Sequence, residues 1–160
     1  LARRDDKLNP EIEEIEPNFF DNIFENYSLI AEESGKVLSC SNQLRTSIKS
    51  DKTLIKQVMT ILFDNAVKYT GDDGAIRITV SNSDRKLVIT VADNGSGISE
   101  EDKSKIFDRF YRIDKARTRQ TGGFGLGLSL AKQIVEALKG TIAVRDNTPT
   151  GTVFEIKLNT

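Results

Sequence analysis

The sequence predicts an α/β (α+β) two-layer sandwich, in which helices cover one face of a mixed, mostly antiparallel sheet. Apolar residues recur at helical spacing in three separate segments, and other segments alternate apolar and polar residues as strands do. One strand, residues 86–92, is apolar on both faces, so it requires a central place in the sheet. Elements of these kinds bury their apolar faces against one another in one core.

Composition limits the classes of protein that fit. With 160 residues, 38% hydrophobic and 29% charged, the chain suits one globular domain with a real core. The net charge of −1 provides no basic field for nucleic acid, so no nucleic-acid partner is expected. No apolar run approaches transmembrane length.

The chain has no histidine and a single cysteine. The lack of histidine excludes Ser-His and Cys-His catalysis and histidine-ligated metal sites, and zinc is excluded with them. A hard cation held by oxygen ligands is compatible with the composition. Cys40 cannot form an internal disulfide, and its place in an apolar-polar alternation predicts a buried thiol.

The first third of the chain predicts a short strand, a helix and two more short strands. The first strand covers residues 12–15, and Asn18 is placed to cap a helix that stops at Gly35. Further strands are expected at residues 37–41 and 44–48. The helix has apolar residues at helical spacing: Phe20, Ile23, Phe24, Tyr27 and Ala31.

The next helix is expected to begin at an Asp51 cap and to end before Gly71. Its apolar stripe is wide, so most of the helix should be buried. The stripe consists of Ile55, Val58, Met59, Leu62 and Ala66.

Asn65 is conspicuous on so apolar a helix, because a buried amide without a partner costs about 1 to 3 kcal/mol. Lys68 and Tyr69 project beside it, at i+3 and i+4. Taken alone, these residues favour an ordinary interpretation. Asp64 and Lys68 would form a surface ion pair, Asn65 would bond to the backbone, and Tyr69 would pack.

A hairpin and a polar segment follow. Residues 71–74 have turn chemistry, and strands over 75–81 and 86–92 are joined by a tight turn at 82–85. The second strand runs into DNGSGIS, residues 93–99. Its carboxylate at the end of a central strand could accept hydrogen bonds from a ligand that the glycines allow to approach. A solvated turn is the simpler interpretation of this segment alone.

Ser99 and Asp102 resemble a capping box for a short helix to Ile106. Residues 107–120 lack amphipathic order and are typical of a mobile basic flap. An ordinary solvated loop is the alternative, although the aromatic residues are unusually apolar for one. The flap holds five cations: Arg109, Arg112, Lys115, Arg117 and Arg119.

Four glycines within six residues open the last predicted helix, in the stretch TGGFGLGLSLAKQIVEALKG, residues 121–140. Bare N–H groups at a helix start favour an anion. Neither the P-loop nor the dinucleotide pattern fits, because Leu128 stands where one needs Lys and the other Gly. A flexible turn is an equal alternative. Two strands, residues 141–145 and 152–158, then alternate across a turn at 147–151.

Five motifs, in order, resemble those of the ATP-binding catalytic domain of two-component sensor histidine kinases, within the ATPase superfamily of gyrase, Hsp90 and MutL. DNAVKYT resembles the N box, DNGSGIS the first glycine box and IFDRFYRID the F box. GGFGLGLSLAK resembles the second glycine box and GTVFEI the Gly-Thr box. The resemblance covers about residues 8–158. Each motif is weak singly, but five in the right order are highly specific.

The resemblance implies the Bergerat fold, with about three helices over the sheet and a mobile ATP lid, and it implies ATP and Mg²⁺ as ligands. Asn65 would hold the magnesium ion, Lys68 would add a charge near the phosphates, and Tyr69 would line the site. Asp93 would accept a hydrogen bond from the adenine amine, and Thr152 would support that pocket.

Three residues would be catalytic by resemblance: Asn65, Lys68 and Arg112, the last reaching the phosphates as the flap closes. Tyr111 would contact adenine or ribose. The two glycine boxes would supply room for the ring, a hinge for the lid and backbone donors for phosphate. Their predicted nucleotide contacts are Gly95, Gly97, Ile98, Gly123, Phe124, Gly125, Leu126, Gly127 and Leu128.

Two residues depart from the family pattern. Ile61 stands one turn before Asn65, where relatives usually carry a polar residue, and this removes a hydrolytic general base. Phe124 stands between the glycines, where a small hydroxyl residue is common. Because of these two departures, a domain that binds ATP without transferring phosphate is an alternative to the kinase. A hydrolysing relative of the gyrase type is a weaker alternative because of Ile61 and the F box.

The resemblance also implies partners. The acceptor histidine would lie on a separate dimerisation domain, which would pass phosphate to a response regulator. Residues 1–8 would be the end of that dimerisation helix, and residues 9–160 the ATP-binding catalytic domain. The whole protein is expected to be a homodimeric bacterial membrane sensor with this domain in the cytoplasm, and the isolated domain a monomer.

Overall fold

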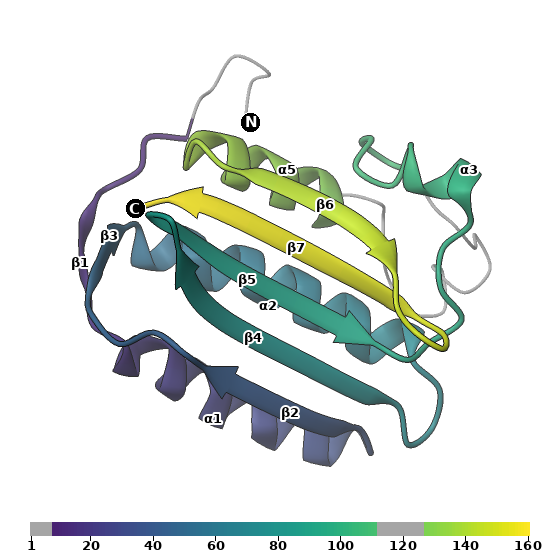
Figure 1. Ribbon diagram of the computed structural model, residues 1–160. Coiled ribbons are helices and arrows are strands. Elements are labelled where there is room, and N and C mark those ends of the chain that lie inside the picture. Colours follow the sequence, from purple (N-terminus) through teal and green to yellow (C-terminus); the bar gives the residue numbers. More distant parts are fainter. Residues whose placement is uncertain (1–7, 112–126) are drawn as a thin grey trace.

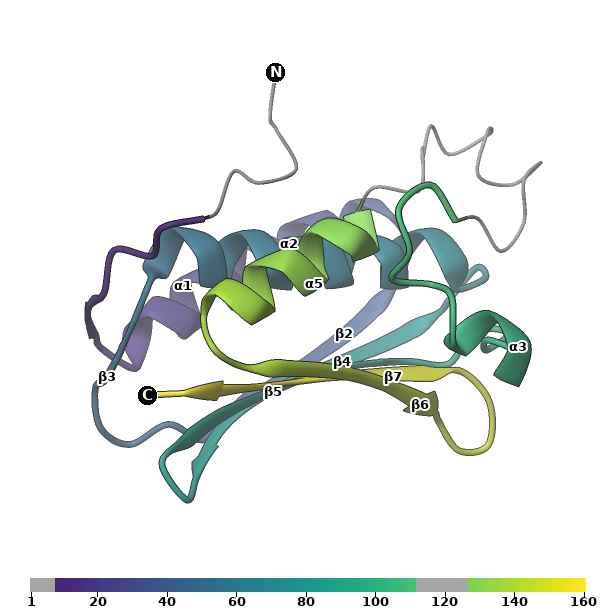
Figure 2. The same ribbon diagram turned by 90° about the horizontal axis from the view of Figure 1, so that it is seen from above.

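The computed structural model describes residues 8–111 and 127–160. A five-stranded sheet carries three long helices on one face, which confirms the predicted two-layer sandwich (Figures 1 and 2). The helices are α1 (Asn18–Glu33), α2 (Lys52–Tyr69) and α5 (Gly127–Ala137). The strands, in their order across the sheet, are β2 (Val37–Asn42), β4 (Ala75–Ser83), β5 (Lys86–Asp93), β7 (Thr152–Asn159) and β6 (Thr141–Asp146).

The sheet is mixed because β2 pairs with β4 in parallel, whereas the other neighbouring strands are antiparallel. β5 is the middle strand, as its apolar composition predicts. The turn from β4 to β5 has two central residues, Asp84 (φ 51°) and Arg85 (φ 62°), between the pair Ser83 and Lys86. Two positive φ angles match the right-handed twist of a hairpin.

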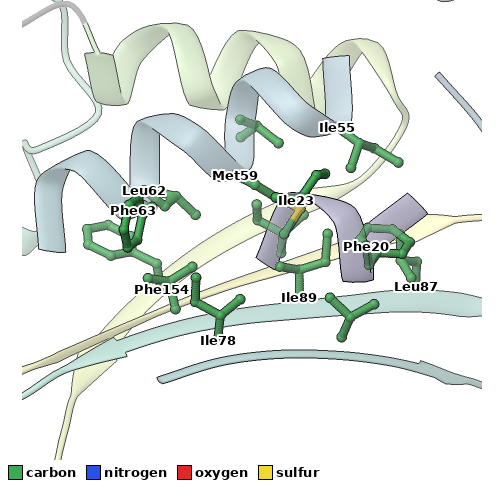
Figure 3. Packing of buried hydrophobic residues seen from close by; sticks show 14 of the residues in the cluster. Phe20, Ile23, Ile55, Met59, Leu62, Phe63, Ile78, Leu87, Ile89 and Phe154 are labelled. Carbon is green, nitrogen blue, oxygen red and sulfur yellow. The ribbon is translucent and has the colours of Figure 1, made fainter. Parts of the chain in front are cut away.

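The core lies between the helices and the sheet (Figure 3). Leu62 and Phe63 of α2 are fully buried, and the ring of Phe63 stacks on Tyr27 of α1 with centroids 4.3 Å apart. The Tyr27 hydroxyl lies 2.7 Å from Thr60 Oγ1, and burial raises the pKa of Tyr27 to about 12. The apolar stripes predicted for α1 and α2 are buried, so α2 is fixed firmly over the sheet.

Two boundaries differ from prediction in the first third of the chain. Asn18 does not cap α1; it is the first helical residue, after Pro17. The proline ring already holds φ at a helical value (−55°), so the helix begins without a side-chain cap. The strand expected at 44–48 is β3 (Ile48–Ser50), which pairs with β1 (Glu13–Ile15) in a separate small sheet.

The burial of Leu44 in a loop explains the misplaced strand. Its N–H donates to Asn42 Oδ1 at 3.1 Å, a local turn that ends β2. The prediction of a buried Cys40 is also wrong, because β2 is an edge strand and the residue is exposed. Neighbouring protein atoms still desolvate the thiol and raise its pKa to about 11, so it stays protonated at neutral pH.

The predicted Asp51 cap is confirmed, because Asp51 Oδ1 accepts the N–H of Leu54 at 3.0 Å. At the other end of α2, the ammonium of Lys36 donates to the carbonyls of Thr70 (3.1 Å) and Gly71 (2.7 Å). A cation is favourable at a helix C-terminus. Within the part of the chain that the structure describes, none of the helices has the length and apolar character of a membrane span.

Candidate nucleotide-binding site

Asp93 ends β5 on the face of the sheet that the helices cover. It pairs with Ile76 on one side and Thr152 on the other, and all three are buried. The Gly95 N–H donates to Asp93 Oδ1 at 2.9 Å, and the backbone N–H of Thr152 also donates to the carboxylate. Burial raises the pKa of Asp93, and these two N–H groups oppose the rise.

The loop after Asp93 packs against the end of α2. A Cβ on Gly95 would lie 2.5 Å from the carbonyl oxygen of Tyr69, so only glycine allows this approach. The contact joins two motifs that are about 25 residues apart in the sequence. It brings the helix end that carries Asn65 and Lys68 next to the carboxylate of Asp93.

The turn between β6 and β7 closes the other side of Asp93. A Cβ on Gly151 (φ 110°) would lie 1.9 Å from the Asp93 carbonyl oxygen, so this position also requires glycine. Gly97 lies beside the Gly151 carbonyl, where an added Cβ would be 3.3 Å away. Thr152 is 4% exposed and begins β7. The Gly-Thr box therefore supports Asp93 through its backbone.

The residues predicted to approach the phosphates share the last turns of α2. Asn65 and Tyr69 are half-buried there, and Lys68 is exposed. Burial raises the pKa of Asp64, and the charge of Lys68 opposes the rise. Asp64 and Lys68 thus interact as an i, i+4 pair, as the ordinary interpretation of this stretch predicts.

Ile61 contacts the start of α5. A Cβ on Gly127 would lie 3.5 Å from Ile61 Cγ2, which is ordinary packing distance. Ile61 is half-buried against the core, as are Ile98 and Leu128. An apolar residue at position 61 therefore fits the packing between α2 and α5, although it removes a polar group from the site.

Residues 99–111, which include the first part of the predicted flap, are held by side-chain contacts. The predicted cap is confirmed, because Ser99 Oγ accepts the Asp102 N–H at 3.1 Å, but α3 (Glu100–Lys103) ends before Ile106. Tyr111 donates its hydroxyl proton to the Asp102 carboxylate, which raises the pKa of Tyr111 to about 12. The predicted contact of Tyr111 with a nucleotide stays a prediction.

Two further contacts attach this segment to the sheet. Lys103 lies 2.7 Å from Asp146 of β6, and the ring of Phe107 meets Phe154 of β7 edge to face, with centroids 6.2 Å apart. Phe110, by contrast, is 60% exposed. The other residues predicted for the flap and lid lie outside the described part of the chain. They are Arg112, Lys115, Arg117, Arg119, Gly123, Phe124, Gly125 and Leu126.

Several residues of the site could not be foreseen from the sequence. Asn147 donates its Nδ2–H to the Asp93 carbonyl at 2.8 Å, and Asn94 accepts the Ala75 N–H at 2.9 Å. Thr150 donates to the Asn94 carbonyl at 3.3 Å. Asn147 and Thr150 belong to a recognisable turn, but nothing in the sequence names their partners.

The donors suited to a metal ion are sparse. Among residues 8–111 and 127–160, no group of three or more His, Cys, Asp or Glu side chains could hold a metal ion. The amide oxygen of Asn65 is a hard ligand of the kind that Mg²⁺ accepts. Because Mg²⁺ usually keeps several waters and binds substrate phosphates, one protein ligand fits an ion that arrives with a nucleotide.

The fold and the site together define an ATPase domain of the histidine kinase type. Residues 50–160 match the family described as histidine kinase-, DNA gyrase B-, and HSP90-like ATPase, and the chain belongs to this family. It is 61% identical, over 158 residues and 99% of its length, to the sensor protein CiaH of Streptococcus pneumoniae serotype 4. The chain spans 36% of the length of that relative.

The chain also resembles solved structures of histidine kinases. The nucleotide-free catalytic domain of histidine kinase ThkA is 28% identical, with a TM-score of 0.78, and the match covers 92% of this chain and 97% of that one. ThkA has also been solved in complex with the response regulator protein TrrA. Full-length ShkA in complex with AMPPNP has a TM-score of 0.82 over 96% of this chain and 32% of that one; at 23% identity, the likeness concerns the fold.

Proposed function

We propose that this domain binds Mg-ATP and transfers the γ-phosphoryl group to a histidine on a separate dimerisation domain. The observation that carries the proposal is the buried Asp93 carboxylate, held by two backbone N–H groups beside the end of α2. Membership of the ATPase family supports ATP as the ligand. The chain contains no histidine, so the acceptor must come from elsewhere.

The positions of Asp93, Asn65 and Lys68 support their proposed roles, whereas the role of Arg112 rests on the family resemblance alone. Asp93 would accept a hydrogen bond from the exocyclic amine of adenine in the pocket that Thr152 borders. Asn65 would hold the magnesium ion, which when bound neutralises phosphate charge. Lys68 would add a positive charge at the same end of α2, and Arg112 would reach the phosphates from the flap.

The transfer requires positioning more than covalent help from this domain. A ring nitrogen of the acceptor histidine forms a bond to the γ-phosphorus, while the bond from that phosphorus to the β–γ bridging oxygen breaks. ADP leaves with the electron pair, and the N–H proton of the imidazole passes to solvent. Ile61 offers no general base for water, which favours transfer to histidine over hydrolysis.

The rest of the pathway follows from the same proposal. The whole protein would be a homodimeric sensor in a bacterial membrane, with this domain on the cytoplasmic side and residues 1–8 leading from the dimerisation helix. A response regulator would receive the phosphoryl group from the histidine. The similarity to a protein named as a sensor and the ThkA complex with a response regulator support this arrangement.

The test combines this domain, γ-labelled ATP and Mg²⁺ with the dimerisation domain of the protein that carries it. We expect acid-labile phosphate on a histidine of the added domain. Asn65→Ala should abolish the Mg²⁺-dependent label, whereas Asn82→Ala, in the β4–β5 hairpin, should keep it. Calorimetry of ATP binding is measured in parallel, so that binding and transfer are scored separately.

The outcomes separate the alternatives. ATP binding without label on any histidine would refute the kinase proposal and favour a nucleotide-binding module. Steady release of inorganic phosphate by the domain alone would favour a hydrolysing relative. No binding of ATP would refute all three.

A further inference from the structure

The turn between β6 and β7 contains an asparagine whose side chain is fixed in one orientation. The Asn147 N–H donates to the Gly151 carbonyl at 3.0 Å and closes the turn. Asn147 Oδ1 accepts the N–H of Thr148 at 2.9 Å. With its oxygen engaged in this way, the amide must direct its Nδ2–H outward, and there it donates to the Asp93 carbonyl at 2.8 Å.

This hydrogen bond holds the peptide between Asp93 and Asn94, which lies 54 residues away in the sequence. On the opposite side, the same peptide is held by β4: the Asn94 N–H donates to the Ala75 carbonyl at 3.2 Å, and the Ala75 N–H donates to Asn94 Oδ1 at 2.9 Å. Gly151 packs directly on the Asp93 carbonyl, so no side chain intervenes. The Asp93 backbone is therefore held between β4 and the turn.

The direction of the Asp93 carboxylate depends on that backbone. Its two N–H donors come from different segments, Gly95 after it in the chain and Thr152 across the sheet. A small rotation of the 93–94 peptide would move the carboxylate relative to Thr152 and carry Gly95 with it. The Asn147 bond opposes that rotation from the side of the turn.

We propose that Asn147 is a positioning residue that aims the Asp93 carboxylate and thereby sets the preference for a 6-amino over a 6-oxo purine. The inference rests on the proposed function, in which Asp93 accepts the adenine amine. A correctly aimed carboxylate accepts a hydrogen bond from a 6-amino group and repels a 6-oxo group, which is also an acceptor. A carboxylate that is no longer correctly oriented therefore binds ATP more weakly, whereas inosine triphosphate binding is not weakened.

The experiment measures the affinities of ATP and inosine triphosphate by calorimetry for the parent and its variants. Asn147→Ala should lower the ATP affinity about fivefold, the equivalent of one lost hydrogen bond, with little effect on inosine triphosphate. Asn147→Asp keeps an acceptor for the Thr148 N–H but places a second acceptor against the Asp93 carbonyl. Asn147→Asp should lower the ratio of ATP affinity to inosine triphosphate affinity further. It also provides a test of the inference if the alanine variant folds poorly.

The matched control is Asn159→Ala. Asn159 Nδ2 donates to the Lys139 carbonyl at 3.1 Å, at the opposite end of β7, so its removal costs a similar hydrogen bond away from Asp93. This variant should keep the ATP to inosine triphosphate ratio of the parent. If Asn147→Ala lowered the affinities for both nucleotides equally, or lowered neither, this inference would be overturned but the proposed function would not. A parent that binds neither nucleotide would overturn the proposed function as well.

Discussion

The two sides of the candidate site are held in place by different kinds of contact. On the sheet side, Asp93 is fixed by backbone N–H groups, and glycine lets the backbone of the β6–β7 turn touch its carbonyl. On the flap side, Tyr111 and Lys103 are held by hydrogen bonds and ion pairs near the surface, to Asp102 and Asp146. The sheet side is thus part of the sheet itself, whereas the flap side is attached to the sheet through side chains.

The difference teaches which side can be rearranged at low cost. Backbone contacts across a sheet are lost only when strands separate, whereas exposed ion pairs contribute little and exchange readily with water. We therefore expect the sheet side to keep its geometry with and without nucleotide, and the flap side to adjust. Substitutions on the two sides should differ accordingly in their effects on stability and on binding.

The largest effect is expected from Gly151→Ala. The added Cβ would lie 1.9 Å from the Asp93 carbonyl oxygen, at a backbone with φ of 110°. The free energy of unfolding should fall by about 3 kcal/mol or more, measured by urea denaturation. Gly71→Ala is the control, because a Cβ added there would have no neighbour within 4 Å and the change should be nearly neutral. Similar losses in both variants would contradict the role assigned to the turn.

The second largest effect is expected from Asp93→Asn, which should weaken ATP binding and change the stability of the fold little. An amide keeps the size of the side chain but lacks the charge that strengthens a hydrogen bond to the adenine amine. The affinity for ATP should fall about tenfold to a hundredfold, measured by calorimetry. The control is Asp146→Asn. Asp146 lies two strands from Asp93, on the other side of Thr152, and is exposed, so this variant should bind ATP as the parent does. Unchanged ATP affinity in Asp93→Asn would remove Asp93 from the base-binding role.

The pH dependence should have opposite signs for binding and for stability. Because burial raises the pKa of Asp93, the folded state holds this proton more tightly than the unfolded state. Asp93 therefore stabilises the fold at acid pH, and this contribution is lost as pH rises through the raised pKa. ATP affinity should do the reverse and fall as pH drops through the same pKa, since a protonated carboxyl accepts the amine poorly.

Asp93→Asn should lack both of these dependences. The measurements are urea denaturation and calorimetry between the ordinary aspartate pKa and neutral pH. ATP binding that stays constant as the parent is acidified would contradict an ionised Asp93 as the acceptor.

The smallest effect is expected from Tyr111→Phe on the flap side. The substitution removes the hydrogen bond to Asp102 but keeps the ring, which is partly buried against the core. Since the contact is near the surface, the thermal unfolding midpoint should stay close to that of the parent. ATP affinity should change less than in Asp93→Asn. A larger loss of stability than in Gly151→Ala would reverse the comparison of the two sides.

Much of the fold could be predicted because its signals are local. The apolar stripes of α1 and α2 and the Asp51 cap each depend on residues within a few turns, and the structure confirms them. The predictions that were wrong also depended on local sequence pattern. Asn18 and the strand at 44–48 were plausible from local pattern, but Pro17 and the pairing of β3 with β1 decided otherwise.

The sequence by itself determined the family, since five motifs stand in order, and it determined that any acceptor histidine must lie outside these 160 residues. Only the tertiary structure decided how those motifs meet. The Gly95 contact with Tyr69 and the Asn147 bond to Asp93 join residues far apart in the chain. Such contacts depend on strand register and on where α2 lies over the sheet. Both are set by packing of the whole core, which no short stretch of sequence records.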